Sequence, residues 1–206
     1  STPQSRLPRL YLITDRGRAA DGIGGVVDAL RAALKAGVGL VQFRDKKARA
    51  QRAWELASEV AALCDAHDTR WLANGRADLA MDVGAQGVHR PGGGMPVAAI
   101  RRLMGEEALV GASTHDLDEA LWAEREGADF VTLSPIFASK SKPGYGPTLG
   151  PEGLREVTEV VDIPVYALAG VEPSDVQACL EAGAHGVAVM GGIMAAGDYL
   201  KALDST

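Results

Sequence analysis

Cationic and hydroxyl side chains recur just after short apolar runs of this 206-residue chain. They are Arg44, Lys46, Arg76, Arg90, Ser113, Ser139, Lys140, Ser141 and Lys142. The whole chain has a formal net charge of −6, so cations gathered at such places indicate a site for an anionic ligand, most simply a phosphate. Any one of these cations could instead be solvated or paired with an acidic neighbour such as Asp15 or Asp45.

Acid–base chemistry is predicted for His115. This residue follows an apolar run, and imidazole is the side chain best suited to move protons at neutral pH. Asp116 with Glu119 three residues later has the spacing of a helix N-cap, so we interpret Asp116 as structural. His89 follows another apolar run and is a weaker candidate for the same chemistry.

The elements that must position these residues are eight short apolar or β-branched runs separated by stretches of helical composition. We predict strands at 10–14, 40–44, 71–74, 87–89, 109–113, 130–134, 165–169 and 186–190, and helices that include 51–66, 117–126 and 174–182. Four glycine-containing turns each join the end of a helical stretch to a strand. Eight units of about 26 residues predict a single-domain (β/α)8 TIM barrel over 1–206. A flavodoxin-like doubly wound sheet is the alternative, although such sheets normally have five or six strands.

A barrel of this kind carries its active site at the C-terminal ends of its strands, where all of these side chains fall. Gln42, Asn74 and Ser113 also end strands and are predicted to contact substrate. Gly170, Gly191 and Gly192 follow the last two strands, where backbone N–H groups commonly bind phosphate. The connection 135–150 is long and rich in Gly and Pro, which predicts a mobile lid whose serines and lysines grip an anion.

Composition excludes several classes of protein. With 47% hydrophobic and 23% charged residues, the chain resembles a globular domain and not a disordered segment. Its 27 Asp and Glu against 21 Lys and Arg give no general attraction to nucleic acid. No apolar run approaches 18 residues and the first ten residues lack a signal peptide, so we expect no membrane partner and a cytoplasmic location. No His, Cys or carboxylate spacing indicates a metal site, and homo-oligomerisation is left open.

Motifs spread over nearly the whole chain resemble the thiamine phosphate synthase/TenI superfamily. They lie at 10–15 (LYLITD), 41–46 (VQFRDK), 87–89 (GVH), 113–115 (STH), 134–142 (SPIFASKSK) and 186–189 (GVAV). The resemblance implies a (β/α)8 barrel that binds a thiazole phosphate. It implies phosphate or diphosphate contacts at Arg44, Lys46, Ser139, Ser141, Lys142 and Gly170, with Gly191 and Gly192 at the thiazole phosphate.

Two activities occur in this superfamily, and they differ in two carboxylates. The synthase joins a pyrimidine diphosphate to a thiazole phosphate, releasing diphosphate, with Mg²⁺ held by the Asp of an Asn-Asp-Arg triplet and by a second Asp one strand later. Here residues 74–76 read Asn-Gly-Arg and 89–94 read His-Arg-Pro-Gly-Gly-Gly. Mg²⁺ favours carboxylate ligands, so the resemblance points to the cofactor-free TenI-type branch of thiazole tautomerases.

These tautomerases aromatise a carboxythiazole phosphate by moving a proton. The resemblance implies that His115 is the catalytic histidine and that Arg44 or Lys46 receives the substrate carboxylate. Two alternatives stay open. One is a synthase that recruits Mg²⁺ through Asp15 or Asp45, because its Ser-x-Ser-Lys segment resembles the synthase's diphosphate loop. The other is a non-catalytic regulator of the thiamine pathway that binds a phosphate ligand.

Overall fold

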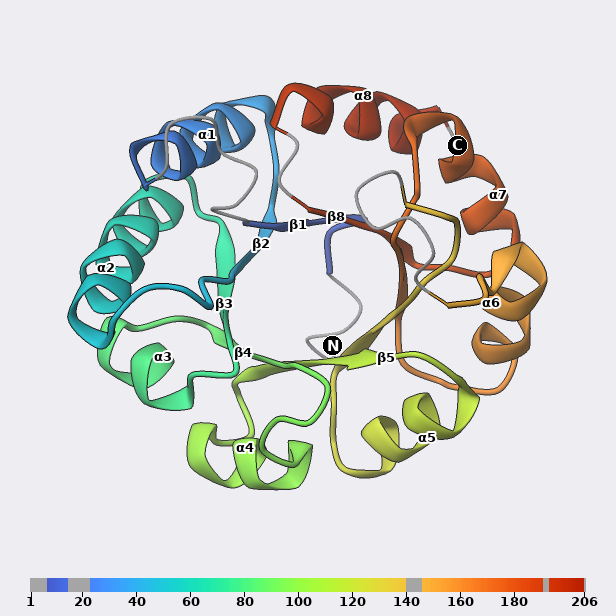
Figure 1. The fold of residues 1–206 in the computed structure, drawn as a ribbon, viewed down its shortest axis with the longest axis horizontal. Helices are drawn as coiled ribbons and strands as arrows, with labels where there is room; N and C mark the ends of the chain where they lie inside the picture. The colour runs from blue at the N-terminus through green and yellow to red at the C-terminus, as the bar shows by residue number, and fades with distance from the viewer. Residues whose placement is uncertain (1–6, 15–22, 140–145, 191–192, 206) are drawn as a thin grey trace.

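Eight parallel strands close into a barrel in the computed structural model, which describes residues 7–14, 23–139, 146–190 and 193–205 (Figure 1). The strands are β1 (Leu10–Ile13), β2 (Leu40–Phe43), β3 (Arg70–Asn74), β4 (Gly87–Arg90), β5 (Leu109–Thr114), β6 (Phe130–Leu133), β7 (Val165–Leu168) and β8 (Gly186–Met190). Each strand pairs in parallel with the next, and β8 pairs with β1 in the register Leu10 to Val187. The predicted TIM barrel is therefore confirmed, and the doubly wound alternative, which has no such closure, is wrong.

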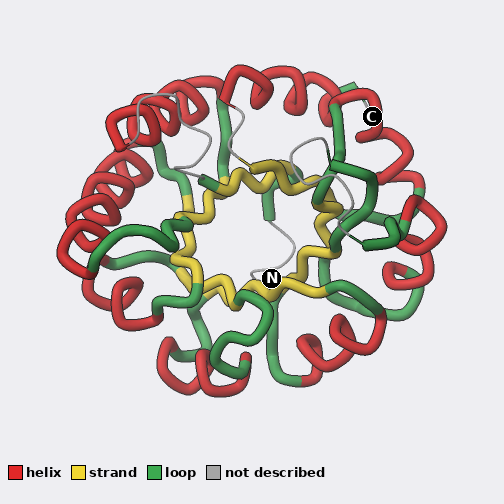
Figure 2. The backbone as a smooth tube through the Cα atoms, in the orientation of Figure 1, coloured by secondary structure: helices red, strands yellow, loops and turns green. Residues whose placement is uncertain are grey.

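Helices surround the barrel as an outer ring (Figure 2). They are α1 (Ile23–Ala36), α2 (Ala50–Ala66), α3 (Ala77–Val83), α4 (Val97–Met104), α5 (Leu117–Arg125), α6 (Gly150–Thr158), the 3-10 helix η3 (Pro173–Asp175), α7 (Val176–Glu181) and α8 (Ile193–Asp204). The predicted helix 174–182 is thus divided between η3 and α7. The predicted strand 165–169 ends one residue early because Ala169 has a φ of +78°, which extended backbone does not allow.

The core has two layers because successive side chains of a strand point to opposite faces. In β1, Leu10 and Leu12 belong to the layer between strands and helices, whereas Tyr11 and Ile13 point into the barrel. Tyr11 and Phe130 meet edge to face there, with ring centroids 5.3 Å apart. Both faces of each strand are buried, so polar residues inside the barrel must find partners there.

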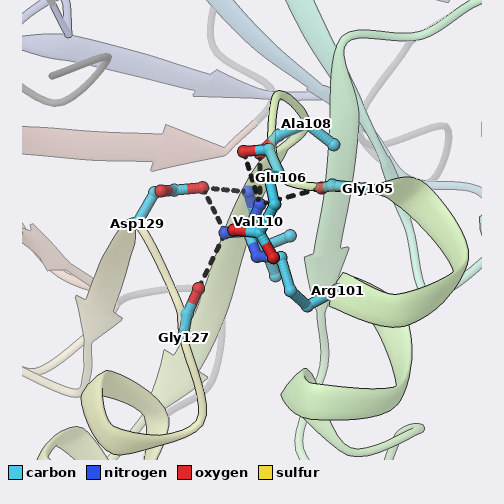
Figure 3. A network of polar contacts seen from close by, with 7 residues as sticks. All are labelled: Arg101, Gly105, Glu106, Ala108, Val110, Gly127 and Asp129. Atoms are coloured by element: carbon cyan, nitrogen blue, oxygen red, sulfur yellow. Dashed lines mark hydrogen bonds and ion pairs between the residues drawn. The ribbon is translucent and has the colours of Figure 1, made fainter.

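A guanidinium group ties together the loops at the N-terminal end of the barrel, opposite the strand ends that carry the candidate site. Figure 3 shows Arg101 of α4 donating to the backbone carbonyls of Gly105, Glu106, Ala108 and Gly127 and to the carboxylate of Asp129. The shortest of these bonds is 2.7 Å, and the two charged side chains are only 13% and 15% exposed. The same carboxylate oxygen of Asp129 accepts from the backbone N–H of Val110, so one network joins the starts of β5 and β6.

Arg101→Met is expected to lower the free energy of unfolding by about 2 kcal/mol, because it leaves a largely buried carboxylate and several carbonyls without their donor. Urea denaturation measures this loss. The control is Arg31→Met, which removes an exposed ion pair with Asp28 and should change stability by about 0.5 kcal/mol or less. Equal losses in the two variants would contradict a structural role for the Arg101 network.

Candidate functional site

A chain of polar side chains crosses the interior of the barrel and ends at the strand termini. The Nδ2 group of Asn74 donates to Oε1 of Gln42 (2.7 Å), and Nε2 of Gln42 donates to the hydroxyl of Tyr11 (3.0 Å). That hydroxyl lies 3.0 Å from Nδ1 of His89, whose Nε2 lies 2.9 Å from Oγ of Ser113. The five side chains come from β1 to β5, so barrel closure brings three predicted substrate contacts, Gln42, Asn74 and Ser113, into one network.

Sequence reasoning missed Tyr11 as a site residue and missed that His89 belongs to a hydrogen-bond network. A signal for Tyr11 was present, because the period-two rule places residue 11 on the opposite face from residues 10 and 12. That signal was hidden because both faces of a barrel strand are apolar. His89 was considered only as a general acid or base, and its burial excludes that role in the charged form.

Burial favours the neutral forms of both Tyr11 and His89. His89 is 1% exposed, and desolvation lowers its pKa to about 3. Desolvation likewise raises the pKa of the Tyr11 hydroxyl well above its ordinary value. The network is therefore uncharged across the physiological pH range, and it can offer hydrogen bonds but not ionic contacts.

The neutral state of His89 makes the protein acid-sensitive. Below pH 6.5 the histidine takes up a proton in the unfolded chain but not in the folded one, so stability must fall as the pH falls towards about 3. The loss approaches about 1.4 kcal/mol per pH unit below pH 6.5, which gives about 2 kcal/mol between pH 6.5 and 4.5. We expect His89→Asn to remove the contribution of one proton to the pH dependence of the free energy of unfolding, measured by urea denaturation at several pH values. An unchanged slope would show that His89 is protonated in the folded protein.

His115 lies at the C-terminal end of β5, in front of α5. One oxygen of Glu119, Oε2, accepts from both the backbone N–H of His115 (2.8 Å) and its ring Nδ1 (2.9 Å). Asp116 accepts from the backbone N–H of Glu119 and caps α5, so the predicted N-cap is confirmed. A methyl group placed on Gly92 would lie 3.8 Å from Cε1 of His115, so the β4–α4 loop lies beside the ring.

The pairing with Glu119 determines which ring nitrogen of His115 can act as a base. A carboxylate can only accept, so it holds the proton on Nδ1 and leaves the lone pair on Nε2. Within the described part of the chain, Nε2 of His115 has no hydrogen-bond partner. A base supported in this way resembles the oriented histidines of general acid–base catalysis.

The structure divides the predicted cations into two groups. Arg76 forms two hydrogen bonds with Asp78 (2.9 and 3.0 Å), and Arg90 donates to the carbonyls of Gly94 and Met95, so both hold their own loops. Arg90 also lies over the ring of Trp122, 5.1 Å from its centroid. Among the residues the structure describes, the side chains of Arg44 and Lys46 have no such protein partner, and they stay the predicted anion contacts.

The two predicted phosphate-binding loops are described only in part. Gly170 has a φ of +65°, and a methyl group there would lie 2.5 Å from the carbonyl oxygen of Phe137. The absence of a side chain at Gly170 thus allows the backbone of the β6–α6 connection to pack closely against it. In this contact the backbone N–H of Phe137 donates to the carbonyl of Ala169 (3.1 Å). Ser139 follows this contact; its role and that of Gly170 towards phosphate stay predictions. The other predicted contacts lie outside the described residues: Lys140, Ser141, Lys142, Gly191 and Gly192.

The carboxylates beside Asn74 do not fit a Mg²⁺ site. Asn74 is followed by Gly75, and both oxygens of Asp78 accept from Arg76. Oδ1 of Asp45 accepts from the backbone N–H groups of Lys47 and Ala48, and its Oδ2 is buried. Mg²⁺ needs several oxygens that reach it in near-octahedral geometry, and both oxygens of Asp78 and Oδ1 of Asp45 already accept hydrogen bonds from the protein. Asp15, the other acidic candidate, lies outside the described residues.

Comparison with known proteins gives the family. The thiamine monophosphate synthase family (TMP-TENI) matches residues 10–193 of this chain. The chain belongs to this family. It is 42% identical over 182 residues to the putative thiamine-phosphate synthase 2 of Aquifex aeolicus, covering 88% of this chain and 95% of the relative. It is 38% identical over 194 residues to the thiamine-phosphate synthase of Chloroflexus aurantiacus, covering 94% and 88%.

A solved structure of a similar protein shares the architecture. The thiamine phosphate pyrophosphorylase from Pyrococcus furiosus superposes with a TM-score of 0.83 at 29% identity, covering 96% of each chain. The predicted superfamily is therefore confirmed, and this protein is an enzyme of a thiamine-biosynthesis family. The narrower assignment to the TenI-type branch is not supported by the relatives, whose names favour the synthase alternative. In the described part of the chain, no helix is long and apolar enough to cross a membrane.

Proposed function

We propose that this protein is a thiazole phosphate tautomerase. The observation that carries the proposal is the His115–Glu119 pair at the end of β5, a supported base at the mouth of a barrel whose neighbouring carboxylates do not fit Mg²⁺. Tautomerisation is a proton transfer and needs such a base. The synthase reaction joins two substrates with loss of diphosphate, and it needs a metal ion that neutralises the charge of the diphosphate.

In this mechanism Nε2 of His115 takes the proton from the ring carbon of the carboxythiazole phosphate and returns it to the exocyclic carbon. No atom is gained or lost, and aromatisation of the ring drives the reaction. Glu119 stabilises the imidazolium that exists between the two steps. Arg44 or Lys46 receives the substrate carboxylate, and the glycine loops after β7 and β8 hold its phosphate.

The second candidate is a thiamine phosphate synthase. The relatives in Aquifex aeolicus and Chloroflexus aurantiacus carry that name, and the structure from Pyrococcus furiosus is named for the same reaction. These names favour the synthase over the tautomerase, while the residues around Asn74 favour the tautomerase. If this protein is a synthase, its metal ligands differ from Asp45 and Asp78.

One pair of assays on the wild-type protein separates the two candidates. Carboxythiazole phosphate in deuterium oxide should be aromatised with incorporation of solvent deuterium, at a rate that EDTA does not change. A pyrimidine diphosphate with a thiazole phosphate should release no diphosphate, with or without added Mg²⁺. Mg²⁺-dependent release of diphosphate, with no tautomerase activity, would replace our proposal by the synthase. Binding of the thiazole phosphate with no turnover in either assay would instead indicate a regulator.

A further inference from the structure

The hydrogen bonds of the network inside the barrel all donate in one direction along the chain of side chains. This direction determines whether the last side chain offers a ligand a donor or an acceptor. We propose that Asn74, Gln42, Tyr11, His89 and Ser113 form a one-way hydrogen-bond relay that keeps His89 as its Nε2–H tautomer and makes Ser113 a hydroxyl donor to the ligand. Tyr11 and His89 are then positioning residues that act through Ser113. The inference rests on the proposed function only in taking the ligand to be a carboxythiazole phosphate.

The direction follows from counting donors along the relay. Gln42 accepts from Asn74 through Oε1 and donates to the Tyr11 oxygen through Nε2. The Tyr11 oxygen therefore receives one proton and must place its own on the remaining neighbour, Nδ1 of His89, 3.0 Å away. A neutral imidazole that accepts at Nδ1 carries its proton on Nε2.

The same assignment of donors and acceptors extends to Ser113, at the end of the relay nearest the barrel mouth. Nε2–H of His89 donates to Oγ of Ser113 over 2.9 Å, so the serine oxygen is used as an acceptor and its own proton remains available. Ser113 is half-buried at the end of β5 and has no other partner among the residues the structure describes. Its proton therefore faces the barrel mouth. The opposite direction would present only lone pairs there, which suits an anionic ligand poorly.

The relay offers a hydrogen bond but does not move a proton. If Ser113 gave its proton to the ligand and each member shifted one proton along, Tyr11 would be left as a buried tyrosinate. Burial raises the pKa of that hydroxyl well above its ordinary value, so this state is strongly disfavoured. Proton transfer thus stays with His115, and the relay recognises a neutral or anionic acceptor, such as a ring nitrogen or a carboxylate oxygen of the thiazole.

Tyr166 provides a matched control within the same aromatic cluster. Its ring packs 5.5 Å from that of Tyr11 and it is equally buried. Its hydroxyl, however, donates to the carbonyl of Pro8 at the N-terminal end of the barrel, away from the relay. Tyr11→Phe and Tyr166→Phe therefore remove the same group from the same core, but only the first interrupts the relay.

Nitrogen-15 NMR of the imidazole rings tests the tautomer directly in the free protein. The wild-type protein and Tyr166→Phe should show His89 protonated at Nε2 only, whereas Tyr11→Phe should show a mixture of tautomers. In the tautomerase assay, Tyr11→Phe should raise KM for carboxythiazole phosphate about tenfold with kcat little changed, and Tyr166→Phe should match the wild type. Ser113→Ala, which alters a half-buried position and leaves the rest of the relay intact, should raise KM similarly with the His89 tautomer unchanged.

Two results would overturn the relay. One is a wild-type His89 protonated at Nδ1, and the other is a KM that changes equally in Tyr11→Phe and Tyr166→Phe. If the wild-type protein has no tautomerase activity, the proposed function fails by itself. The relay is then judged by the NMR measurement and by calorimetric binding of a thiazole phosphate to the same variants.

Discussion

His115→Asn is expected to reduce the rate of thiazole aromatisation by a factor of about 10²–10⁴, the usual contribution of a general acid–base group. Asparagine keeps a polar side chain at the end of β5, but it has no nitrogen that can take and return a proton at neutral pH. Glu119→Gln should have a smaller effect, about tenfold, because an amide can still accept from Nδ1 but stabilises the imidazolium less. The rates are measured as deuterium incorporation into the product.

The control for this experiment is His67→Asn. His67 is an exposed histidine at the C-terminal end of α2, where its Nδ1 bonds to the carbonyl of Leu63. Helices of the barrel end at the side away from the candidate site, so this variant should keep the wild-type rate. A His115→Asn variant with the wild-type rate and a normal melting temperature would remove the proposed base. It would also leave Glu119 with a role only in holding the start of α5.

Gly186→Ala is expected to destabilise the barrel strongly. A methyl group at this first residue of β8 would lie 1.8 Å from the carbonyl oxygen of Arg9, a backbone atom that cannot turn aside. That same oxygen accepts from the N–H of Val187 (2.9 Å), so moving it breaks the pairing that closes β8 onto β1. We expect a loss of at least about 3 kcal/mol, which lowers the melting temperature by roughly 6–12 °C in a domain of this size.

Gly197→Ala makes the same chemical change with the opposite expected sign. Gly197 lies inside α8, and a methyl group there would meet no atom within 4 Å. Alanine restricts the unfolded chain and favours the helix, so stability should rise by about 0.5–1 kcal/mol. Differential scanning calorimetry compares the two variants. Similar melting temperatures for both would show that the approach of β8 to Arg9 is not the constraint that the geometry indicates.

Much of the architecture could be predicted because it depends on local patterns. Strand starts, and four of the turns before them, can be read from a few neighbouring residues, as in the Gly-Ala-His-Gly segment that leads into β8 at Gly186. The Asp116 cap follows from its spacing of three residues to Glu119, and the place of His115 follows from the apolar run before it. The family resemblance, carried by motifs in the right order, extended this to the chemistry of the ligand.

The partners of polar side chains could not be predicted in this way. Tyr11 and His89 are 78 residues apart, and only closure of β1 onto β8 and the pairing of β1 through β5 bring them together. The same holds for Arg76 and Arg90: their types indicated an anion site, while their side-chain conformations place them on Asp78 and on the β4–α4 loop.

The sequence by itself therefore predicted the strand count, favoured a barrel over a doubly wound sheet and placed His115 at the end of a strand, because apolar periodicity, glycine turns and helix caps act over a few residues. The tertiary structure alone decided which side chains meet inside the barrel. Those contacts depend on register and burial, which sum over the whole chain. Burial also decided the neutral state of His89, because a pKa is set by the surroundings that the fold provides and not by the residue type.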